Sequence, residues 1–205
     1  MTQPVSPTQE EQVLALASTT SLLRARDLTL RSLPTVTLSR LVLAGRLQRV
    51  ARGVYALPGT LSSEHRPLAE VTLQVPRGVI CLLSALRFHG LGTQVPRQVW
   101  LAMPHNSPTP RVQRPLVHTV RMSGASLTEG IQTVQVDGVD VRMFNAAKTI
   151  ADCFKYRNKI GIDIALEALR DGWAQGRVTT DELFQYAAID RVSNVMRPYI
   201  ESVAI

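Results

Sequence analysis

The chain has 205 residues, of which 45% are hydrophobic and 19% are charged, and its formal net charge is +7. This length allows one or two domains, and the apolar fraction is too high for a disordered chain. Its two cysteines are far apart, which excludes a disulfide framework and a paired-cysteine zinc site. No apolar run reaches the ~18 residues of a membrane span, and the first residues lack the order of a signal peptide. We therefore expect a cytoplasmic protein with no membrane partner.

The positive charge is confined to the front of the chain. Residues 1–60 carry a net charge of +4, residues 61–122 carry +5, and residues 123–205 carry −2. A small, basic, globular protein favours nucleic acid as its partner, although an arginine-rich surface that only contacts water is the alternative. The asymmetry between the two halves predicts two parts with different tasks.

The first sixty residues predict a winged helix-turn-helix domain. Thr8 and Glu11 have the spacing of a capping box at the start of a first helix of about three turns. A second helix is predicted from Arg24 to Ser32, and a third begins at Thr35 or Thr37. Two short helices joined by a tight turn are typical of the helix-turn-helix motif.

A β-hairpin is predicted directly after the third helix, where a wing would lie. Its strands run from Leu47 to Val50 and from Val54 to Leu57, with the turn at Arg52-Gly53. Arginines in this hairpin are placed to contact phosphates or the minor groove. The residues that we expect to bind double-stranded DNA are Thr35, Thr37, Ser39, Arg40, Arg46, Arg49, Arg52 and Tyr55.

The third helix has two distinct faces at about 100° per residue. Leu38 and Leu41 define the inward face, whereas Arg40 points outward among small apolar side chains. Arginine commonly reads guanine edges, and apolar groups contact thymine methyls. We therefore expect Arg40 to contact bases; the alternative is that it contacts only phosphate or solvent.

Residues 61–205 are predicted to form a second, mixed α+β domain, because helices, strands and further helices follow one another. The expected elements are a helical connector at 61–76, a buried helix at 79–91, strands at 99–103 and 116–121, a hairpin at 131–144 around Asp137-Gly138, and helices at 146–156, 160–170, from 179 or 180, and at 192–202. The helix at 160–170 is expected to close at Gly172. The fold class is thus α+β, with a winged helix at residues 1–60.

The search for chemistry predicts no catalytic residue, no cofactor site and no metal site. The four histidines do not have the spacing of metal ligands, and Asp137 and Asp140 are most simply explained as turn residues. Lys148, Asp152 and Lys155 share one face of a predicted helix, and we expect them to be surface charge pairs. A contact with nucleic acid or with a protein partner is the alternative for this cluster. We therefore expect that the protein is not an enzyme.

Three segments carry a resemblance to a known family. They are LSRLVLAGRLQRVARGVYALPG from Leu38 to Gly59, CLLSALRFHGLGTQVPRQVWLAMP from Cys81 to Pro104, and FNAAKTIADCFKYRNKIGIDIALEALRDG from Phe144 to Gly172. In this order they resemble the AbiEi family of antitoxins and transcriptional regulators of type IV toxin–antitoxin systems. The resemblance implies an antitoxin that binds repeats in the promoter of its own operon and represses it.

The resemblance also implies a role for the second domain, residues 61–205, in counteracting a cognate nucleotidyltransferase toxin without necessarily forming a stable complex. Contact with the toxin, reversal of its chemistry and protection of its target all remain open as routes. Two alternative functions remain: a nucleic-acid-processing enzyme that the winged helix targets, and a toxin-binding module that binds no DNA.

Overall fold

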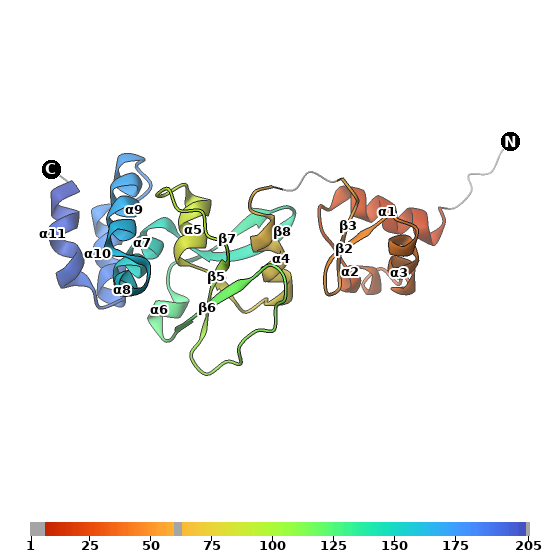
Figure 1. Ribbon diagram of the computed structural model, residues 1–205, viewed down its shortest axis with the longest axis horizontal. Helices are drawn as coiled ribbons and strands as arrows, with labels where there is room; N and C mark the ends of the chain where they lie inside the picture. The colour runs from red at the N-terminus through yellow and green to blue at the C-terminus, as the bar shows by residue number, and fades with distance from the viewer. Residues whose placement is uncertain (1–6, 60–62, 204–205) are drawn as a thin grey trace. The chain divides into compact units, whose positions relative to one another are not determined.

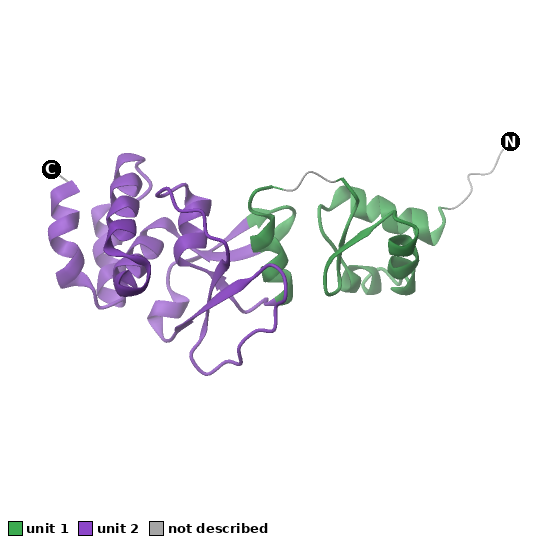
Figure 2. Cartoon of the chain, in the orientation of Figure 1, with its two compact units in different colours: residues 1–74, 135–140 green, residues 75–134, 141–205 purple. Residues whose placement is uncertain are grey.

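The structure is a computed structural model, and it describes residues 7–59 and 63–203. The chain divides into two compact units, each of which is described by itself (Figure 2). Unit 1 consists of residues 1–74 and 135–140, and unit 2 of residues 75–134 and 141–205. The domain boundary that we predict between residues 60 and 61 lies outside the described residues, and residues 63–74 cluster with unit 1.

Unit 1 contains the winged helix-turn-helix (Figure 1). The elements of the winged helix in chain order are α1 (Gln9–Thr19), β1 (Leu23–Arg24), α2 (Ala25–Thr29), α3 (Val36–Leu43), β2 (Gln48–Ala51) and β3 (Val54–Ala56). The strands form an antiparallel sheet in the order β1-β3-β2. The core of the winged helix consists of small and aliphatic side chains from α1, α2 and α3, from β1 and from the residue before β2: Val13, Ala17, Leu23, Leu28, Leu38, Leu41 and Leu47. The predicted domain type is confirmed.

Local sequence signals account for the ends of these elements. The capping box at α1 is present, since Glu11 N–H donates to Thr8 Oγ1 at 3.3 Å and Thr8 N–H donates to Glu11 Oε2 at 2.7 Å. The turn of the wing needs a left-handed residue, which Gly53 supplies with a φ of 72°. Both signals are local in sequence, and this explains why they are predictable.

The predicted second helix is too long. Residues Leu23–Arg24 form strand β1, which pairs with Val54 and Tyr55 of β3, and α2 spans only Ala25–Thr29. The start of the helix is fixed by Asp27, because Arg24 N–H donates to its carboxylate at 2.9 Å. The chain leaves the helical region at Ser32, where φ is 57°. Strand pairing with the wing thus overrides the helical pattern at Arg24.

The second sheet has five strands: β4 (Val79–Ile80), β5 (Val99–Pro104), β6 (Val117–Met122), β7 (Ile131–Val136) and β8 (Val139–Phe144). Their order is β6-β5-β4-β8-β7, in which β5 and β6 are parallel, as are β4 and β8. The β7–β8 hairpin turns at Asp137 and Gly138 with φ values of 48° and 75°, as a tight hairpin turn with two left-handed residues requires. This hairpin confirms the prediction from its Asp-Gly pair.

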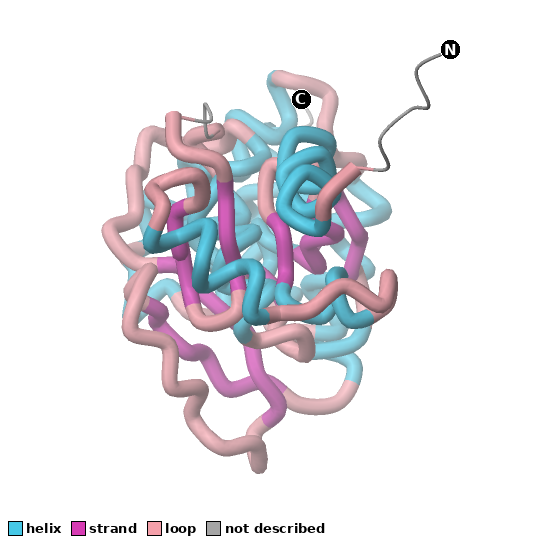
Figure 3. The backbone as a smooth tube through the Cα atoms, turned by 90° about the vertical axis from the view of Figure 1, so that its right-hand side faces the viewer, coloured by secondary structure: helices cyan, strands magenta, loops and turns pink. Residues whose placement is uncertain are grey.

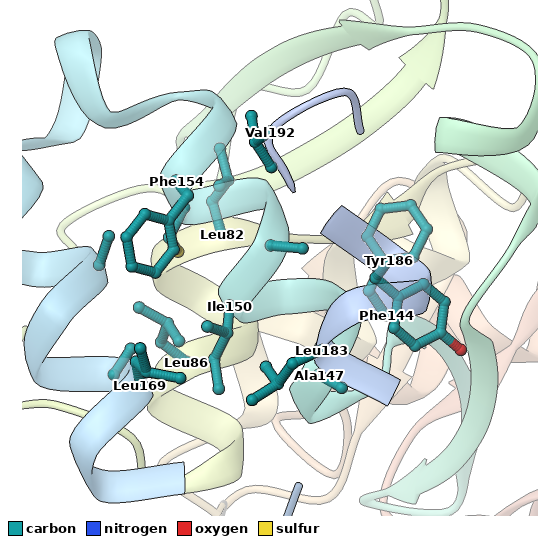
Figure 4. Packing of buried hydrophobic residues seen from close by; sticks show 14 of the residues in the cluster. Leu82, Leu86, Phe144, Ala147, Ile150, Phe154, Leu169, Leu183, Tyr186 and Val192 are labelled. Atoms are coloured by element: carbon teal, nitrogen blue, oxygen red, sulfur yellow. The ribbon is translucent and has the colours of Figure 1, made fainter. Parts of the chain in front are cut away.

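The helices that follow unit 1's winged helix are α4 (Arg66–Gln74), α5 (Leu82–His89), α6 (Ala125–Thr128), α7 (Ala146–Lys155), α8 (Arg157–Ile160), α9 (Ile162–Ala174), α10 (Thr180–Ile189) and α11 (Ser193–Val203). In unit 2, α5, α7, α9, α10 and α11 enclose one core around Leu86, Ile150, Phe154 and Leu183 (Figure 4). Helices and strands both recur along the chain (Figure 3), and the α+β fold class is confirmed.

One predicted helix of unit 2 begins too early, and another has a different end. The apolar run 79–91 is a short strand followed by α5, because Cys81 is extended and its N–H donates to Trp100 O at 3.1 Å. The helix that we expected to close at Gly172 continues to Ala174. A Cβ at Gly172 would lie 2.8 Å from Ile150 Cδ1, so this glycine allows α9 to approach α7 closely. Its role is packing and not helix termination.

Candidate nucleic-acid interface

Helix α3 presents one buried face and one exposed face. Thr37, Leu38 and Leu41 are buried against the core of the winged helix. At about 100° per residue, the four exposed side chains of the helix fall within a sector of about 100° on the opposite side. These four, the α3 face, are Val36, Ser39, Arg40 and Leu43. The burial of one side of α3 therefore determines which side chains a partner would contact.

The arginines of the winged helix divide into paired and unpaired ones. Arg24 Nη2 lies 3.0 Å from Asp27 Oδ1, and Arg46 Nη1 lies 3.9 Å from Glu10 Oε2. Arg31 donates to the backbone oxygen of Asp27 at 3.3 Å. Within the described residues, the side chains of the four remaining arginines have no hydrogen-bond or ion-pair partner: Arg26, Arg40, Arg49 and Arg52.

The three acidic residues of the winged helix are engaged inside it. Glu10 faces Arg46, Asp27 faces Arg24, and Glu11 closes the capping box with Thr8. Hydrogen bonds from the Thr8 backbone and then from its hydroxyl lower the pKa of Glu11, so this carboxylate stays ionised in its cap. The charge that the domain offers to a partner is therefore that of the unpaired guanidinium groups.

The wing presents two of those unpaired arginines. Arg49 lies on β2 opposite Tyr55 of β3, and Arg52 lies at the turn next to Gly53. Both arginine side chains are exposed, whereas Tyr55 is half-buried and packs against the core of the winged helix. Tyr55 thus connects the wing to the core, and its ring is only partly available to a ligand.

The structure separates the predicted contact residues into three groups. Thr35, Ser39, Arg40, Arg49 and Arg52 are exposed, as the prediction requires. Arg46 is exposed but shared with Glu10, and Tyr55 is half-buried. Thr37 is only 2% exposed, because it lies four residues before the buried Leu41 on the same face of α3, so it does not belong to the contact set.

Sequence reasoning missed one candidate, Arg26 on α2. Its guanidinium is exposed and unpaired because the neighbouring Asp27 bonds to Arg24 instead. The three-residue spacing between Arg24 and Asp27 could have indicated that Asp27 caps the helix. A carboxylate that caps a helix is not free to pair with the adjacent Arg26.

The second unit holds a buried ionic network in place of the expected surface charge pairs. Lys148 Nζ lies 2.6 Å from Asp152 Oδ1 and 3.1 Å from Asp190 Oδ2, and all three side chains are buried. Lys155 Nζ lies 3.2 Å from Asp190 Oδ1 and donates to Ser126 Oγ at 2.9 Å. The surface interpretation of Lys148 and Asp152 is therefore wrong.

Burial shifts the titration of the groups near this network. Desolvation is the largest effect on Asp152, and it raises the pKa of this carboxyl well above its usual range. The attraction of Lys148 opposes this rise, and the repulsion of Asp190 adds to it. Desolvation likewise raises the pKa values of the Cys81 and Cys153 thiols, and both cysteines are buried and free. Neither thiol has the exposed, electropositive surroundings that activate a nucleophile.

The remaining titratable candidates have structural partners. His89 Nε2 lies 2.8 Å from Phe144 O, and burial lowers the pKa of this histidine. Asp140 accepts a hydrogen bond from Gln135 across the hairpin, and Asp137 sits in its turn. Among residues 7–59 and 63–203, no group of three or more histidine, cysteine or acidic side chains could hold a metal ion. No helix in those residues is long and apolar enough to cross a bilayer.

The winged helix matches a family model. Residues 11–58 match the model described as "Transcriptional regulator, AbiEi antitoxin", which covers the segment from α1 to just beyond β3. The predicted resemblance to the AbiEi antitoxin regulators is confirmed there, and the match supports a regulator and antitoxin role. The resemblance that we predict for residues 81–104 and 144–172 lies outside the matched segment and stays a prediction.

Among solved structures, the chain is similar to the crystal structure of the RV2827C protein from Mycobacterium tuberculosis. The TM-score is 0.61 at 17% sequence identity, over 91% of this chain and 73% of that chain. At this identity the likeness concerns the fold alone. The search of curated proteins finds no match to the chain.

Proposed function

We propose that this chain is a DNA-binding antitoxin that represses transcription of its own toxin–antitoxin operon and counteracts a cognate nucleotidyltransferase toxin. Residues 1–60 bind the promoter, and residues 61–205 carry the antitoxin function. The match of residues 11–58 to the AbiEi regulators supports this proposal. DNA as the partner rests on one observation above all: the winged helix exposes unpaired guanidinium groups on α3 and on the wing, and its carboxylates are engaged internally.

The proposed contacts have two roles. Helix α3 enters the major groove and presents Thr35, Ser39 and Arg40 to the base edges, as the second helix of a helix-turn-helix does. The wing arginines Arg49 and Arg52 contact phosphates or the minor groove, which positions the domain without reading sequence.

Two further arginines have conditional roles in this proposal. Arg26 adds a phosphate contact from α2. Arg46 joins only if its weak, exposed pair with Glu10 opens, and such a pair costs little to break.

DNA binding is tested with the full chain and a duplex that carries its own promoter. We expect a shift of this duplex at lower protein concentration than for random DNA of the same length. The triple variant R40A/R49A/R52A should lose binding to both, whereas R170A, which removes an exposed arginine of α9, should bind like the wild type. Equal binding of the triple variant and the wild type would refute the DNA-binding role.

The regulatory and antitoxin functions are tested in cells. A promoter fusion should be repressed by the wild type and released by R40A/R49A/R52A. The proposal requires a nucleotidyltransferase toxin in the same operon. Expression of the chain together with that toxin should restore the growth that the toxin alone prevents, and pull-down of the pair then tells whether the two form a stable complex. Growth that is not restored by the wild-type chain would contradict the antitoxin role and leave a DNA-binding regulator. Turnover of nucleic acid by the purified chain would favour the alternative of an enzyme.

A further inference from the structure

The α3 face combines one cation with two large apolar side chains that are exposed. Val36 is 53% exposed and Leu43 is 90% exposed, and Arg40 lies between them at spacings of four and three residues. Residues at these spacings lie above one another on a helix. Along the helix axis the face therefore runs from an apolar group to a guanidinium and to a second apolar group.

Neither apolar side chain is a buried member of the core. The core of the winged helix contains Leu38 and Leu41 from the opposite side of α3, whereas Val36 and Leu43 are exposed. Burying an aliphatic side chain of this size stabilises a fold. Because Val36 and Leu43 are exposed, they contribute little of this stabilisation. A surface that a partner covers is the simpler explanation for both side chains.

We propose that the α3 face reads thymine methyl groups on both sides of a guanine. This deepens the proposed function and rests on it. The C5-methyl of thymine is the one apolar group that projects into the major groove, and O6 and N7 of guanine are the usual targets of arginine. Val36 and Leu43 contact the methyls, and the Arg40 guanidinium bonds to the guanine between them.

The length of the face sets the spacing of the bases. Leu43 lies seven residue steps after Val36, which is about 10.5 Å at 1.5 Å per residue. At 3.4 Å per base step, this corresponds to about three base pairs. The bound sequence should therefore contain two thymines about three base pairs apart in the groove, with the guanine between them.

Charge favours DNA over a second copy of this chain as the occupant. An isologous contact through the α3 face would bring Arg40 of each copy close to the same residue of the other. The unpaired Arg49 and Arg52 of the wing add to this repulsion, because the three carboxylates of the winged helix are already engaged. The phosphates of a duplex are complementary to the same arginines.

The test uses the full chain and the promoter segment that it protects from nuclease cleavage. This segment is synthesised with thymine, or with deoxyuridine in place of the two thymines nearest the protected guanine. Deoxyuridine keeps every hydrogen-bonding group and lacks only the methyl. We expect the wild type to bind about fourfold more weakly for each methyl lost, which corresponds to about 0.8 kcal/mol.

Variants of the two apolar residues complete the test. V36A/L43A should bind the thymine duplex more weakly than the wild type but discriminate thymine from deoxyuridine by less than about twofold. The matched control is L30A, because Leu30 is 80% exposed but lies outside α3, and this variant should keep the wild-type discrimination. The proposal is supported if V36A/L43A loses the discrimination between thymine and deoxyuridine and L30A keeps it.

The remaining outcomes separate the two proposals. If the wild type does not bind the promoter segment, the proposed function fails. If it binds and ignores the loss of methyls, only the present inference fails. Sedimentation of the DNA-free protein provides the last readout, because a change of oligomeric state in V36A/L43A would mean that a second copy covers the α3 face and would overturn the inference.

Discussion

The ammonium nitrogen of Lys148 lies 2.6 Å from Oδ1 of Asp152, and neither side chain is exposed to solvent. The same nitrogen reaches Asp190 at the end of α10, and it lies 4.5 Å from the centre of the Phe144 ring. One lysine thereby joins α7 to the segment between α10 and α11 in the interior of unit 2. Oδ2 of Asp152 is buried and has no hydrogen-bond partner, so the network is incompletely satisfied.

Removing the lysine should be far more harmful than removing the pair. The variant K148M leaves two buried carboxylates facing each other without their shared cation, and we expect it to lose about 3–5 kcal/mol of the free energy of unfolding. The double variant K148M/D152L removes one of the stranded charges and replaces it with an apolar group, so it should lose less than the sum of the two single variants. Urea unfolding of the full chain measures all four species. Additive losses would contradict the coupling between Lys148 and Asp152.

The raised pKa of Asp152 predicts a pH dependence of stability with a definite sign. In the folded chain desolvation lifts the pKa of this carboxyl well above the ordinary value of an aspartate, so the folded state holds the proton more tightly than the unfolded state does. The contribution of Asp152 is therefore fully present below about pH 4, the range of an unfolded aspartate, and is lost as the pH rises through the folded pKa.

The measurement is the difference in the free energy of unfolding between the wild type and D152N across this range, because other carboxylates cancel in the difference. The advantage of the wild type should shrink as the pH rises above about 4. A difference that grows with pH would mean that the cation of Lys148 dominates, so that the carboxylate is stabilised in its ionised form.

Gly172 should not tolerate a methyl group. A Cβ there would lie 2.8 Å from Ile150 Cδ1 and 3.4 Å from Val178 Cγ2, and Ile150 is itself fully buried and cannot move away freely. We expect G172A to lower the free energy of unfolding by about 1–3 kcal/mol, although alanine is intrinsically the better helix former. R170A on the exposed side of the same helix is the control and should change it by no more than about 0.5 kcal/mol. Stabilisation in G172A would show that α7 and α9 can separate without cost.

The parts of the fold that were predictable depend on short-range chemistry. Four local features each depend on no more than four consecutive residues, and the structure contains all of them. They are the capping boxes at Thr8 and Thr179, the Asp137-Gly138 turn and the Asn145 cap. In contrast, β1 and β4 are two residues long, and each exists because a distant strand pairs with it. Such strands leave no periodic pattern in the sequence.

The site was predictable to a similar degree. The faces of α3 follow from a helical repeat, so the exposure of Arg40 and the burial of Leu38 were foreseeable from sequence. The burial of Thr37 depends on where α3 begins, and one residue at a helix terminus decides it. The Lys148 network could not be predicted from the sequence, because Asp190 lies 42 residues away from Lys148. In addition, an i, i+4 pair such as Lys148 and Asp152 has the same spacing on a surface as in a core.

The two arginines Arg40 and Arg49 should have different effects on DNA binding. R49A removes a cation from the wing, so it should weaken binding to all duplexes alike and reduce the magnitude of the slope of log K against log salt by about 0.9. R40A should weaken the promoter segment by about 1–3 kcal/mol and random DNA much less, because a lost guanine contact affects only the sequence that contains it. Titrations at several salt concentrations with both duplexes measure the two effects, and R170A serves as the charge control. An equal loss of affinity for both duplexes in R40A would mean that Arg40 contacts only phosphate, and it would contradict the proposed guanine contact of the α3 face.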